Sequence, residues 1–332
     1  MAGAAPLVLV TGGTGFIGRH LCRFLLAEGC RVRVLCREAS GLGDLGGAVE
    51  TAIGDVTTPA TLPAALAGAD TVFHLASALG ATPVGPQGFF AVNAEGTTHV
   101  LDAARTAGTR RIVHCSSVGV LGNIQGPPAA EDAPLRPEDD YERSKARGEE
   151  IAREQAAAGL PVVIARPGWA YGPGDRRTFK LIYAIAKRRF FFVGDGTTRE
   201  HPVFIDDLTA GLARCRTADI APGEIITIAG DEIVTIEDLC GRIARAIGVP
   251  LSRLHVPREP LRTLAGLMEA AFKIIGRDAP LTRPKVDFFL KHRAYDITKA
   301  RRLLNFAPQV RLDEGLPRTI AWYRKQGWLK SI

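Results

Sequence analysis

The chain lacks the features that would place it in a membrane, in an oxidising compartment or among repeat proteins. None of its apolar runs is long enough to span a bilayer, and its mean hydropathy is only +0.06. Its beginning has neither the basic residues nor the long apolar stretch of a signal peptide. Its six cysteines show no Cys-x-x-Cys or other metal-ligand spacing, and the sequence contains no internal repeat or low-complexity tract. We therefore expect a soluble, cytoplasmic protein with buried thiols, no metal site and no integral membrane segment.

A concentrated basic patch is also missing, although the net charge is +7. Lys and Arg residues are dispersed, and the clusters at 187–189 and 299–302 fall on predicted helices among apolar residues. This distribution favours solvated helix faces, with an anionic cofactor or substrate as the next explanation, and argues against a nucleic-acid partner. With 332 residues and 46% hydrophobic content, the chain can bury one large core and support a smaller lobe.

The most informative stretch is a glycine-rich turn near the start of the chain. An apolar run at 7–11 ends at Gly12, and an amphipathic helical pattern at 20–28 follows Gly15 and Gly18. Glycines allow the tight turn and the close approach of helix to strand, while the unpaired N–H groups at the helix start attract a pyrophosphate. The turn therefore predicts a dinucleotide-binding βαβ unit.

Further apolar runs alternate with helical patterns along the first half of the chain. Strands are predicted at 30–37, 51–56, 70–77, 111–120 and 160–166, and another at 223–229. This alternation is typical of an α/β protein with a Rossmann-type, doubly wound parallel sheet. We expect a cofactor-binding domain over 1–170, with returning segments near 200–230, and a smaller C-terminal lobe, mainly 171–332, that binds the substrate.

The ends of these strands carry the candidate cofactor contacts. The second strand ends without the acidic residue that would bind the adenosine ribose, and Arg37 stands there instead, which favours NADP over NAD. The alternative is that Arg37 is only a solvent-facing strand end. Asp55 is placed to meet the adenine or to cap the following turn, and both roles can coexist. His74 lies within an apolar run, which favours a hydrogen-bonded core histidine over a catalytic one.

The fifth strand ends at Ser116 and Ser117, and a helix is predicted from 139 to about 158. Tyr141 and Lys145 are four residues apart on this helix, so their side chains leave the same face one turn apart. The carboxyl end of a parallel strand is where such sheets bind ligands. The pattern places a hydroxyl, a phenol and an amine near one another.

Together, the glycine turn, Ser117, Tyr141-x-x-x-Lys145 and the Gly/Pro-rich stretch 166–174 resemble the extended short-chain dehydrogenase/reductase superfamily. This superfamily includes nucleotide-sugar epimerases and dehydratases, 3β-hydroxysteroid dehydrogenases and dihydroflavonol reductases. The resemblance implies an enzyme with Ser117, Tyr141 and Lys145 as catalytic residues, Ser116 being the alternative serine, and leaves open a homodimer formed through the helix near Tyr141. The positions expected to bind NAD(P) are Gly12, Gly15, Phe16, Ile17, Gly18, Arg37, Asp55, Val56, Leu75, Ala76, Lys145 and Pro167.

The residue types suit hydride transfer between a nicotinamide and a secondary alcohol or ketone. Tyr141 would exchange the hydroxyl proton, provided that Lys145 and the oxidised nicotinamide lower its pKa. Lys145 would also hold the nicotinamide ribose, and Ser117 would stabilise charge on the substrate oxygen. An ordinary core-edge tyrosine, a surface lysine and a strand-end serine form the structural alternative.

The substrate is indicated by the C-terminal third. Arg199 lies one residue further from Asp206 than expected for an arginine that binds a sugar nucleotide, and His201-Pro202 replaces the usual acidic-aromatic pair. An apolar helical face at 261–275, which could line a pocket, belong to the core or touch a membrane surface, resembles the steroid and flavonoid branches. We therefore predict an NAD(P)-dependent oxidoreductase for a hydrophobic ring substrate of steroid or dihydroflavonol type. The alternatives are a nucleotide-sugar epimerase or dehydratase, with Arg199 on the substrate, and a cofactor-sensing binding protein.

Overall fold

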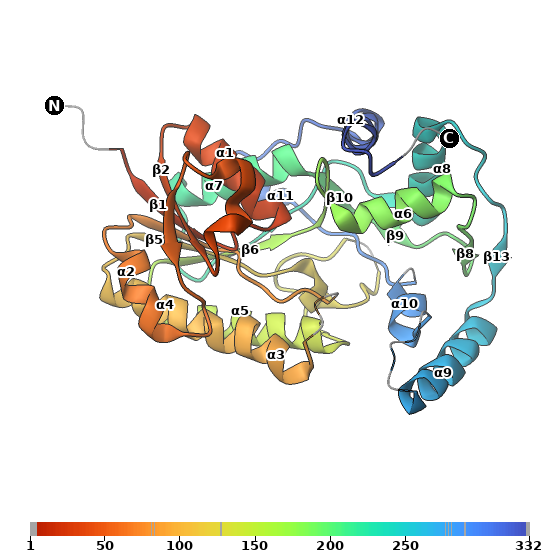
Figure 1. The fold of residues 1–332 in the computed structure, drawn as a ribbon, viewed down its shortest axis with the longest axis horizontal. Helices are drawn as coiled ribbons and strands as arrows, with labels where there is room; N and C mark the ends of the chain where they lie inside the picture. Colours follow the sequence, from red (N-terminus) through yellow and green to blue (C-terminus); the bar gives the residue numbers. More distant parts are fainter. Residues whose placement is uncertain are drawn as a thin grey trace.

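The computed structural model describes residues 5–80, 82, 84–126, 128–275, 277, 279, 281–288 and 290–329. Within these residues, one sheet of parallel strands runs in the order β3-β2-β1-β4-β5-β6-β11 (Figure 1). Its strands are β1 (Leu7–Thr11), β2 (Arg31–Cys36), β3 (Glu50–Ile53), β4 (Thr71–His74), β5 (Arg111–Cys115), β6 (Val162–Pro167) and β11 (Ile225–Ile228). The predicted Rossmann-type, doubly wound sheet is confirmed.

Helices cover both faces of the sheet because its strands are apolar on both sides. On β1, Val8 and Val10 pack into the same core as Leu21 of α1 (Phe16–Ala27), whereas Leu9 points to the opposite core with Ile151 of α5 (Asp140–Ala157). The α1 side also holds α7 (Ile205–Thr217). The α5 side holds α2 (Leu62–Leu66) and α4 (Gly96–Thr106). Figure 1 shows α2, α4 and α5 along one side of the sheet.

The strand order reverses between β1 and β4, and this reversal positions the site. From β1 the chain turns to β2 and β3 on one side, and then crosses to β4, β5 and β6 on the other. The connections leave β1 and β4 in opposite directions, and the carboxyl end of these two strands is therefore the edge at which such sheets form a ligand-binding crevice. Most of the predicted site residues follow the strand ends at this edge.

The chain beyond 170 builds a second lobe but returns to the sheet. α7 packs against α1, and β11 pairs with β6. The short strands pair as β7 (Trp169–Tyr171) with β10 (Pro202–Phe204), β9 (Arg199–Glu200) with β12 (Val234–Thr235), and β8 (Phe192–Val193) with β13 (His255–Val256). The remaining helices are α3 (Pro86–Phe90), α6 (Arg176–Ala186), α8 (Ile236–Ile247), α9 (Arg258–Ile274), α10 (Arg283–Phe288), α11 (Thr298–Leu304) and α12 (Leu312–Lys325).

The apolar face predicted at 261–275 is divided in the structure. Leu261 and Ala265 of α9 are buried in a small core with Val193. Leu264 and Ile275, from the same predicted face, are 49% and 61% exposed. α9 therefore contributes to a local core with one edge and presents leucine side chains to the outside with the other.

Several expectations from composition can be compared with the described residues. All six cysteines are free and buried. Across the residues that the structure describes, there is no group of three or more side chains that could hold a metal ion. None of the described helices combines the length and the apolar character needed to cross a membrane.

Candidate active site

The glycine turn lies directly against the segment that follows β4. Gly12 has φ +72°, and a Cβ there would come within 2.7 Å of the Ala76 nitrogen and the Leu75 carbonyl carbon. A Cβ on Gly18 would lie 2.2 Å from the Gly12 oxygen. The Thr11 hydroxyl accepts a hydrogen bond from the Ala76 N–H at 3.1 Å, which ties the two strand ends together. Side chains are therefore excluded from the floor of the crevice, and a ligand can approach its backbone.

The N-terminus of α1 opens onto this turn and suits a dinucleotide. Gly15 is the N-cap residue and provides no side chain to cap the helix, so the first-turn N–H groups at Phe16 and Ile17 have no intrahelical acceptor. These groups carry the positive end of the helix dipole, to which a pyrophosphate binds. The turn and helix together would hold the diphosphate of a nicotinamide dinucleotide.

The predicted adenosine contacts lie at the ends of β2 and β3. Arg37 follows β2 with an exposed side chain. The Asp55 carboxylate accepts hydrogen bonds from the Thr57 N–H and hydroxyl, both at 2.8 Å, so it caps the turn after β3. The Val56 carbonyl is 2.9 Å from His99 Nδ1. The capping role of Asp55 is thus seen directly, and its contact with adenine remains a prediction.

His74 is a core residue. Its Nδ1 lies 2.8 Å from the Thr11 hydroxyl, and its Nε2 lies 3.1 Å from the Thr97 hydroxyl. Burial lowers the pKa of His74 to about 3, so the imidazole is neutral at ordinary pH. This agrees with the hydrogen-bonded core histidine that the sequence favours.

The two serines after β5 face different surroundings. Ser116 is buried, and its hydroxyl donates to Glu149 Oε2 at 2.6 Å. Ser117 is half-buried and caps the short helix η4 (Val118–Leu121), where its Oγ accepts from the Gly119 N–H at 3.0 Å. The Ser117 hydroxyl also lies close enough to the Tyr141 phenol to lower its pKa. Ser117 is thus the serine that the structure brings beside the phenol.

Tyr141 and Lys145 are positioned by the start of α5. Asp139 is the N-cap residue, and its carboxylate accepts from the Glu142 N–H at 2.7 Å. Tyr141 lies in the first turn of the helix, with its ring centroid 6.4 Å from that of Phe89. Lys145 is buried one turn later and donates from Nζ to the Cys115 carbonyl at 2.6 Å. The end of β5 and the start of α5 thus hold the serine, phenol and amine together.

The electrostatics of this trio differ in one respect from the sequence argument. Burial raises the pKa of Tyr141, and the Ser117 hydroxyl and the charge of Arg177 oppose that rise without cancelling it. Burial likewise lowers the pKa of Lys145, against the effects of Cys115 and Glu149. The protein alone therefore keeps the phenol protonated, because desolvation outweighs the favourable neighbours. The positive charge of an oxidised nicotinamide is the further contribution that a phenolate requires.

A buried ion pair beneath the serines was not assigned a role from the sequence. Arg166 at the end of β6 donates from Nε and Nη2 to the Glu149 carboxylate at 2.9 and 2.5 Å, and Nη1 donates to the Glu131 carbonyl. Neither Arg166 nor Glu149 is more than 2% exposed along its side chain. The signal was an arginine inside an otherwise apolar strand, because such a charge needs a buried partner.

Asn93 is a second residue whose role only the structure shows. Its Oδ1 accepts from the Ser77 hydroxyl and the Ala78 N–H, and its Nδ2 donates to the Ala78 carbonyl and the Ser144 hydroxyl, all at 2.8–3.0 Å. The Ser144 hydroxyl also donates to the Tyr141 carbonyl at 2.8 Å. Asn93 therefore links the segment after β4 to the helix that carries Tyr141 and Lys145.

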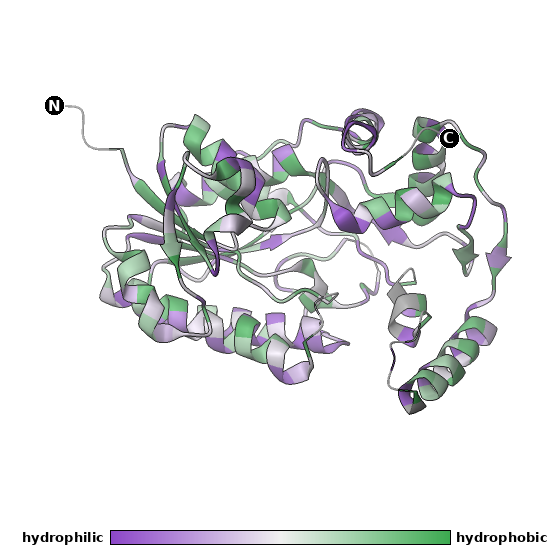
Figure 2. Ribbon diagram, viewed as in Figure 1, coloured by the Kyte–Doolittle hydropathy of each residue, from purple (hydrophilic) through white to green (hydrophobic). Residues whose placement is uncertain are grey.

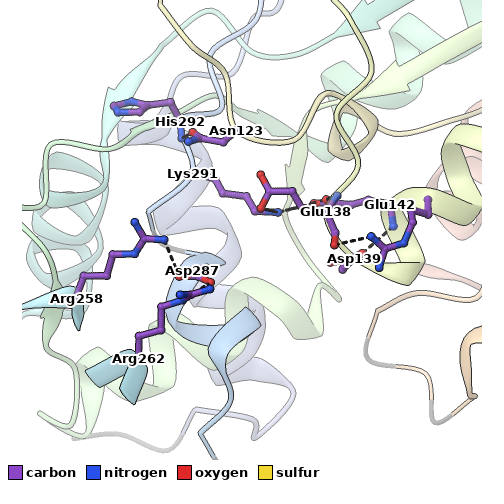
Figure 3. A network of polar contacts seen from close by, with 10 residues as sticks. Asn123, Glu138, Asp139, Glu142, Arg258, Arg262, Asp287, Lys291 and His292 are labelled. Atoms are coloured by element: carbon purple, nitrogen blue, oxygen red, sulfur yellow. Dashed lines mark hydrogen bonds and ion pairs between the residues drawn. The ribbon is translucent and has the colours of Figure 1, made fainter. Parts of the chain in front are cut away.

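The second lobe reaches the same helix through ion pairs (Figure 3). Lys291 Nζ lies 3.0 Å from Glu142 Oε1, next to Tyr141, and 3.3 Å from Glu138 Oε2. Further into the lobe, Arg293 donates to the buried carboxylate of Glu200 at 3.0 Å. These lobe cations already have carboxylate partners.

Arg199 and His201 flank the buried Glu200 and differ from each other in environment. The Arg199 side chain is exposed on β9, and its main chain contacts His292 and Arg293. His201 is buried, with Nε2 at 2.8 Å from the Gly230 carbonyl and Nδ1 accepting from the Tyr295 N–H. His201 therefore links two segments of the lobe.

The other strand-end residues lie at the same edge of the parallel sheet, because Pro167 ends β6, Ser117 follows β5 and Gly12 follows β1. A glycine turn of the dinucleotide-binding type and a serine–tyrosine–lysine set define a nicotinamide-dependent oxidoreductase of the extended short-chain dehydrogenase/reductase superfamily. The model of the NAD dependent epimerase/dehydratase family matches residues 8–229, so the chain belongs to that family. The cofactor-sensing alternative is thereby replaced by an enzyme.

The proteins that the chain is similar to include some named for lipids and some named for nucleotide sugars. It is 31% identical to sterol demethylase protein B of Methylococcus capsulatus, over 97% of this chain and 99% of that protein. It is also 31% identical to the ceramide reductase of Caulobacter vibrioides, over 98% and 97%. Its fold is similar to that of DesIV, the dTDP-glucose 4,6-dehydratase of Streptomyces venezuelae with NAD bound, with a TM-score of 0.79, 28% identity and coverage of 98% and 99%.

Proposed function

We propose that the protein is an NADP-preferring oxidoreductase that transfers a hydride between the nicotinamide and a secondary alcohol or ketone of a hydrophobic ring compound. A steroid or a dihydroflavonol exemplifies this substrate class. The observation that carries the proposal is the grouping of Ser117, Tyr141 and Lys145 beside the glycine turn. We propose these three as the catalytic residues.

Each of the three has a distinct task. The Tyr141 hydroxyl gives its proton to the carbonyl oxygen in reduction and takes it back in oxidation. The Ser117 hydroxyl donates to the same oxygen and stabilises its developing charge. Lys145, held by the Cys115 carbonyl, places a cation one helix turn from the phenol and within reach of the nicotinamide ribose. The bound dinucleotide supplies or accepts the hydride.

The preference for NADP rests on Arg37. Its guanidinium is exposed at the end of β2, the position that faces the adenosine ribose in this fold. A guanidinium there can bind a 2′-phosphate through two hydrogen bonds. We expect Arg37→Ala to raise the KM for NADP about 10-fold or more while the KM for NAD stays nearly constant. Equal effects on the two cofactors would contradict this assignment.

The polarity of the lobe supports an apolar substrate. Lys291 is paired with Glu138 and Glu142, and Arg293 is paired with Glu200. A sugar nucleotide would bring a diphosphate toward Lys291, whose charge is already balanced by two carboxylates, and those carboxylates would repel it. Two relatives named for a sterol and a ceramide support the same choice.

The test is the change in nicotinamide absorbance when purified protein, NADPH or NADP and a panel of ketosteroids, hydroxysteroids and dihydroflavonols are mixed. We expect turnover with at least one member, and a loss of about 10²- to 10⁴-fold in kcat in Tyr141→Phe with NADPH binding retained. No turnover across the panel, or full activity of Tyr141→Phe, would reject the proposal.

A nucleotide-sugar epimerase or dehydratase is the second candidate, because DesIV is similar over nearly the whole chain. In that case the cofactor would co-purify and be reoxidised within each cycle. The protein would then bind a UDP- or dTDP-sugar, and Arg199→Ala would weaken that binding. Calorimetric titration with these nucleotides separates the two candidates.

A further inference from the structure

The outer edge of α9 presents a row of apolar side chains to the exterior. Leu264 and Leu267 are 49% and 65% exposed, and Ile275, which ends the helix, is 61% exposed. Ala271 is exposed between them. Spacings of three and four residues place these four residues, which we call the α9 face, along one side of the helix.

Among the residues that the structure describes, α9 packs through the side opposite the α9 face. Leu261 and Ala265 join the small core with Val193, and Arg258 and Arg262 pair with Asp287 of α10 at 3.3 and 3.1 Å. Figure 1 shows α9 and α10 standing apart from the sheet and its helices, and Figure 2 colours much of α9 as hydrophobic.

The segment around the α9 face is basic. Residues 253–293 contain nine Lys and Arg against four Asp and Glu, and of these cations Lys291 and Arg293 are paired with carboxylates outside the segment. Lys273 and Arg277 are exposed at the end of the helix that carries Ile275. An apolar helix face with cations beside it is complementary to a bilayer whose headgroups are anionic and whose acyl chains begin just beneath them.

We propose that the α9 face docks the protein on the surface of an anionic lipid bilayer. Leu264, Leu267 and Ile275 enter the boundary between headgroups and acyl chains, while Lys273 and Arg277 stay at the headgroups. The helix lies in the plane of the interface, because its 17 residues include charged side chains from Arg258 to Lys273 that do not cross a bilayer core.

The docked helix is connected to the site. Asp287, which holds Arg258 and Arg262, lies four residues before Lys291, and Lys291 contacts Glu142 beside Tyr141 (Figure 3). The next step rests on the proposed function. If the substrate is hydrophobic, docking would place a membrane-dissolved substrate next to the segment that leads from α10 to the site. The docking itself does not depend on that function.

The test is co-sedimentation of the purified chain with vesicles of phosphatidylcholine, with and without an equal part of phosphatidylglycerol. We expect binding to the anionic vesicles that weakens with salt. Leu264→Glu with Leu267→Glu should lower the partition coefficient by at least about 100-fold, since each buried leucine contributes about 10-fold or more. Tyr183→Glu with Ile233→Glu adds the same charge at exposed apolar positions outside α9 and should bind like the wild type. Lys273→Gln with Arg277→Gln should weaken binding to the anionic vesicles roughly 10-fold.

Failure of the wild type to sediment with anionic vesicles overturns the proposal, as does an equal loss in the control pair. If the wild type is instead a dimer that the two leucine substitutions dissociate, and binds no vesicles, the occupant of the α9 face is a second copy and the proposal is wrong. NADPH binding, measured on every variant, separates these outcomes from a failure of the proposed enzymatic function.

Discussion

The adjacent residues Ser116 and Ser117 should give opposite results when each is replaced by alanine. Ser116 is buried and donates to the Glu149 carboxylate at 2.6 Å. Ser117 contacts Tyr141 and sits at the carboxyl edge of the sheet. We expect Ser116→Ala to lower stability and leave catalysis largely intact, and Ser117→Ala to do the reverse.

The magnitudes follow from these contacts. A hydrogen bond to a charged group contributes about 1.5–3 kcal/mol, and Glu149 keeps its two bonds to Arg166 when Ser116 is lost. Ser116→Ala should therefore lower the unfolding free energy by about 2 kcal/mol, a shift of several degrees in Tm. Ser117 is half-buried, so its loss should cost no more than about 1 kcal/mol. Removing a donor that stabilises a developing oxyanion lowers kcat about 10²- to 10³-fold.

Urea unfolding, monitored by circular dichroism, measures the unfolding free energy. Steady-state kinetics with the best substrate of the panel measure kcat. Ser117→Thr retains a hydroxyl and serves as a control, with partial recovery of kcat expected. The reasoning is refuted if Ser117→Ala keeps more than about a third of the wild-type kcat, or if Ser116→Ala loses kcat without losing stability.

Three further predictions concern the scaffold. Glu149→Gln leaves the buried Arg166 without a countercharge, so it should lower the unfolding free energy measured in urea by about 3–5 kcal/mol. The double variant with Arg166→Met should recover part of that loss. A loss below about 1 kcal/mol in Glu149→Gln would contradict the role of the buried pair. Gly18→Ala places a Cβ 2.2 Å from the Gly12 oxygen, so the dinucleotide Kd measured by fluorescence titration should rise at least about 10-fold. An unchanged Kd would argue against the glycine turn as the pyrophosphate site. Burial raises the pKa of Glu200 from 4.5 to about 7 despite Arg293, so the folded chain retains a proton that the unfolded chain releases, and the unfolding free energy should fall as pH rises through that window. Glu200→Gln should flatten this slope in melts at several pH values; an identical slope would exclude Glu200 as its source.

Much of the sheet was predictable because buried parallel strands are continuous apolar runs. Residues 162–164 read Val-Val-Ile and lie in β6, and the predicted 223–229 strand is observed as β11. The glycine turn was equally predictable, since its tight turn and close helix packing allow few residues other than glycine. The Tyr141–Lys145 spacing placed both side chains on one helical face through local geometry alone.

Contacts between distant segments were not predictable. Glu149 lies 33 residues after Ser116 and 17 before Arg166, and no local pattern says that the three meet. The upward shift in the Tyr141 pKa depends on how deeply the ring is buried, which neighbouring elements decide. The periodicity of α9 marked an apolar stripe, but which half of it is covered depends on where α10 and β8 pack.

The sequence by itself determined the class of fold, the cofactor turn and the chemical types of the proposed catalytic residues, because each depends on local conformation or on short spacings. The tertiary structure alone decided which serine faces Tyr141, which carboxylates neutralise Lys291 and Arg293, and which side of α9 is exposed. These features arise where chain segments tens of residues apart come together, and burial and pairing at those contacts set the energies. The nature of the substrate depends on the same long-range contacts, because the part of the chain that would receive it joins segments far apart in the sequence, such as β8 with β13 and β9 with β12.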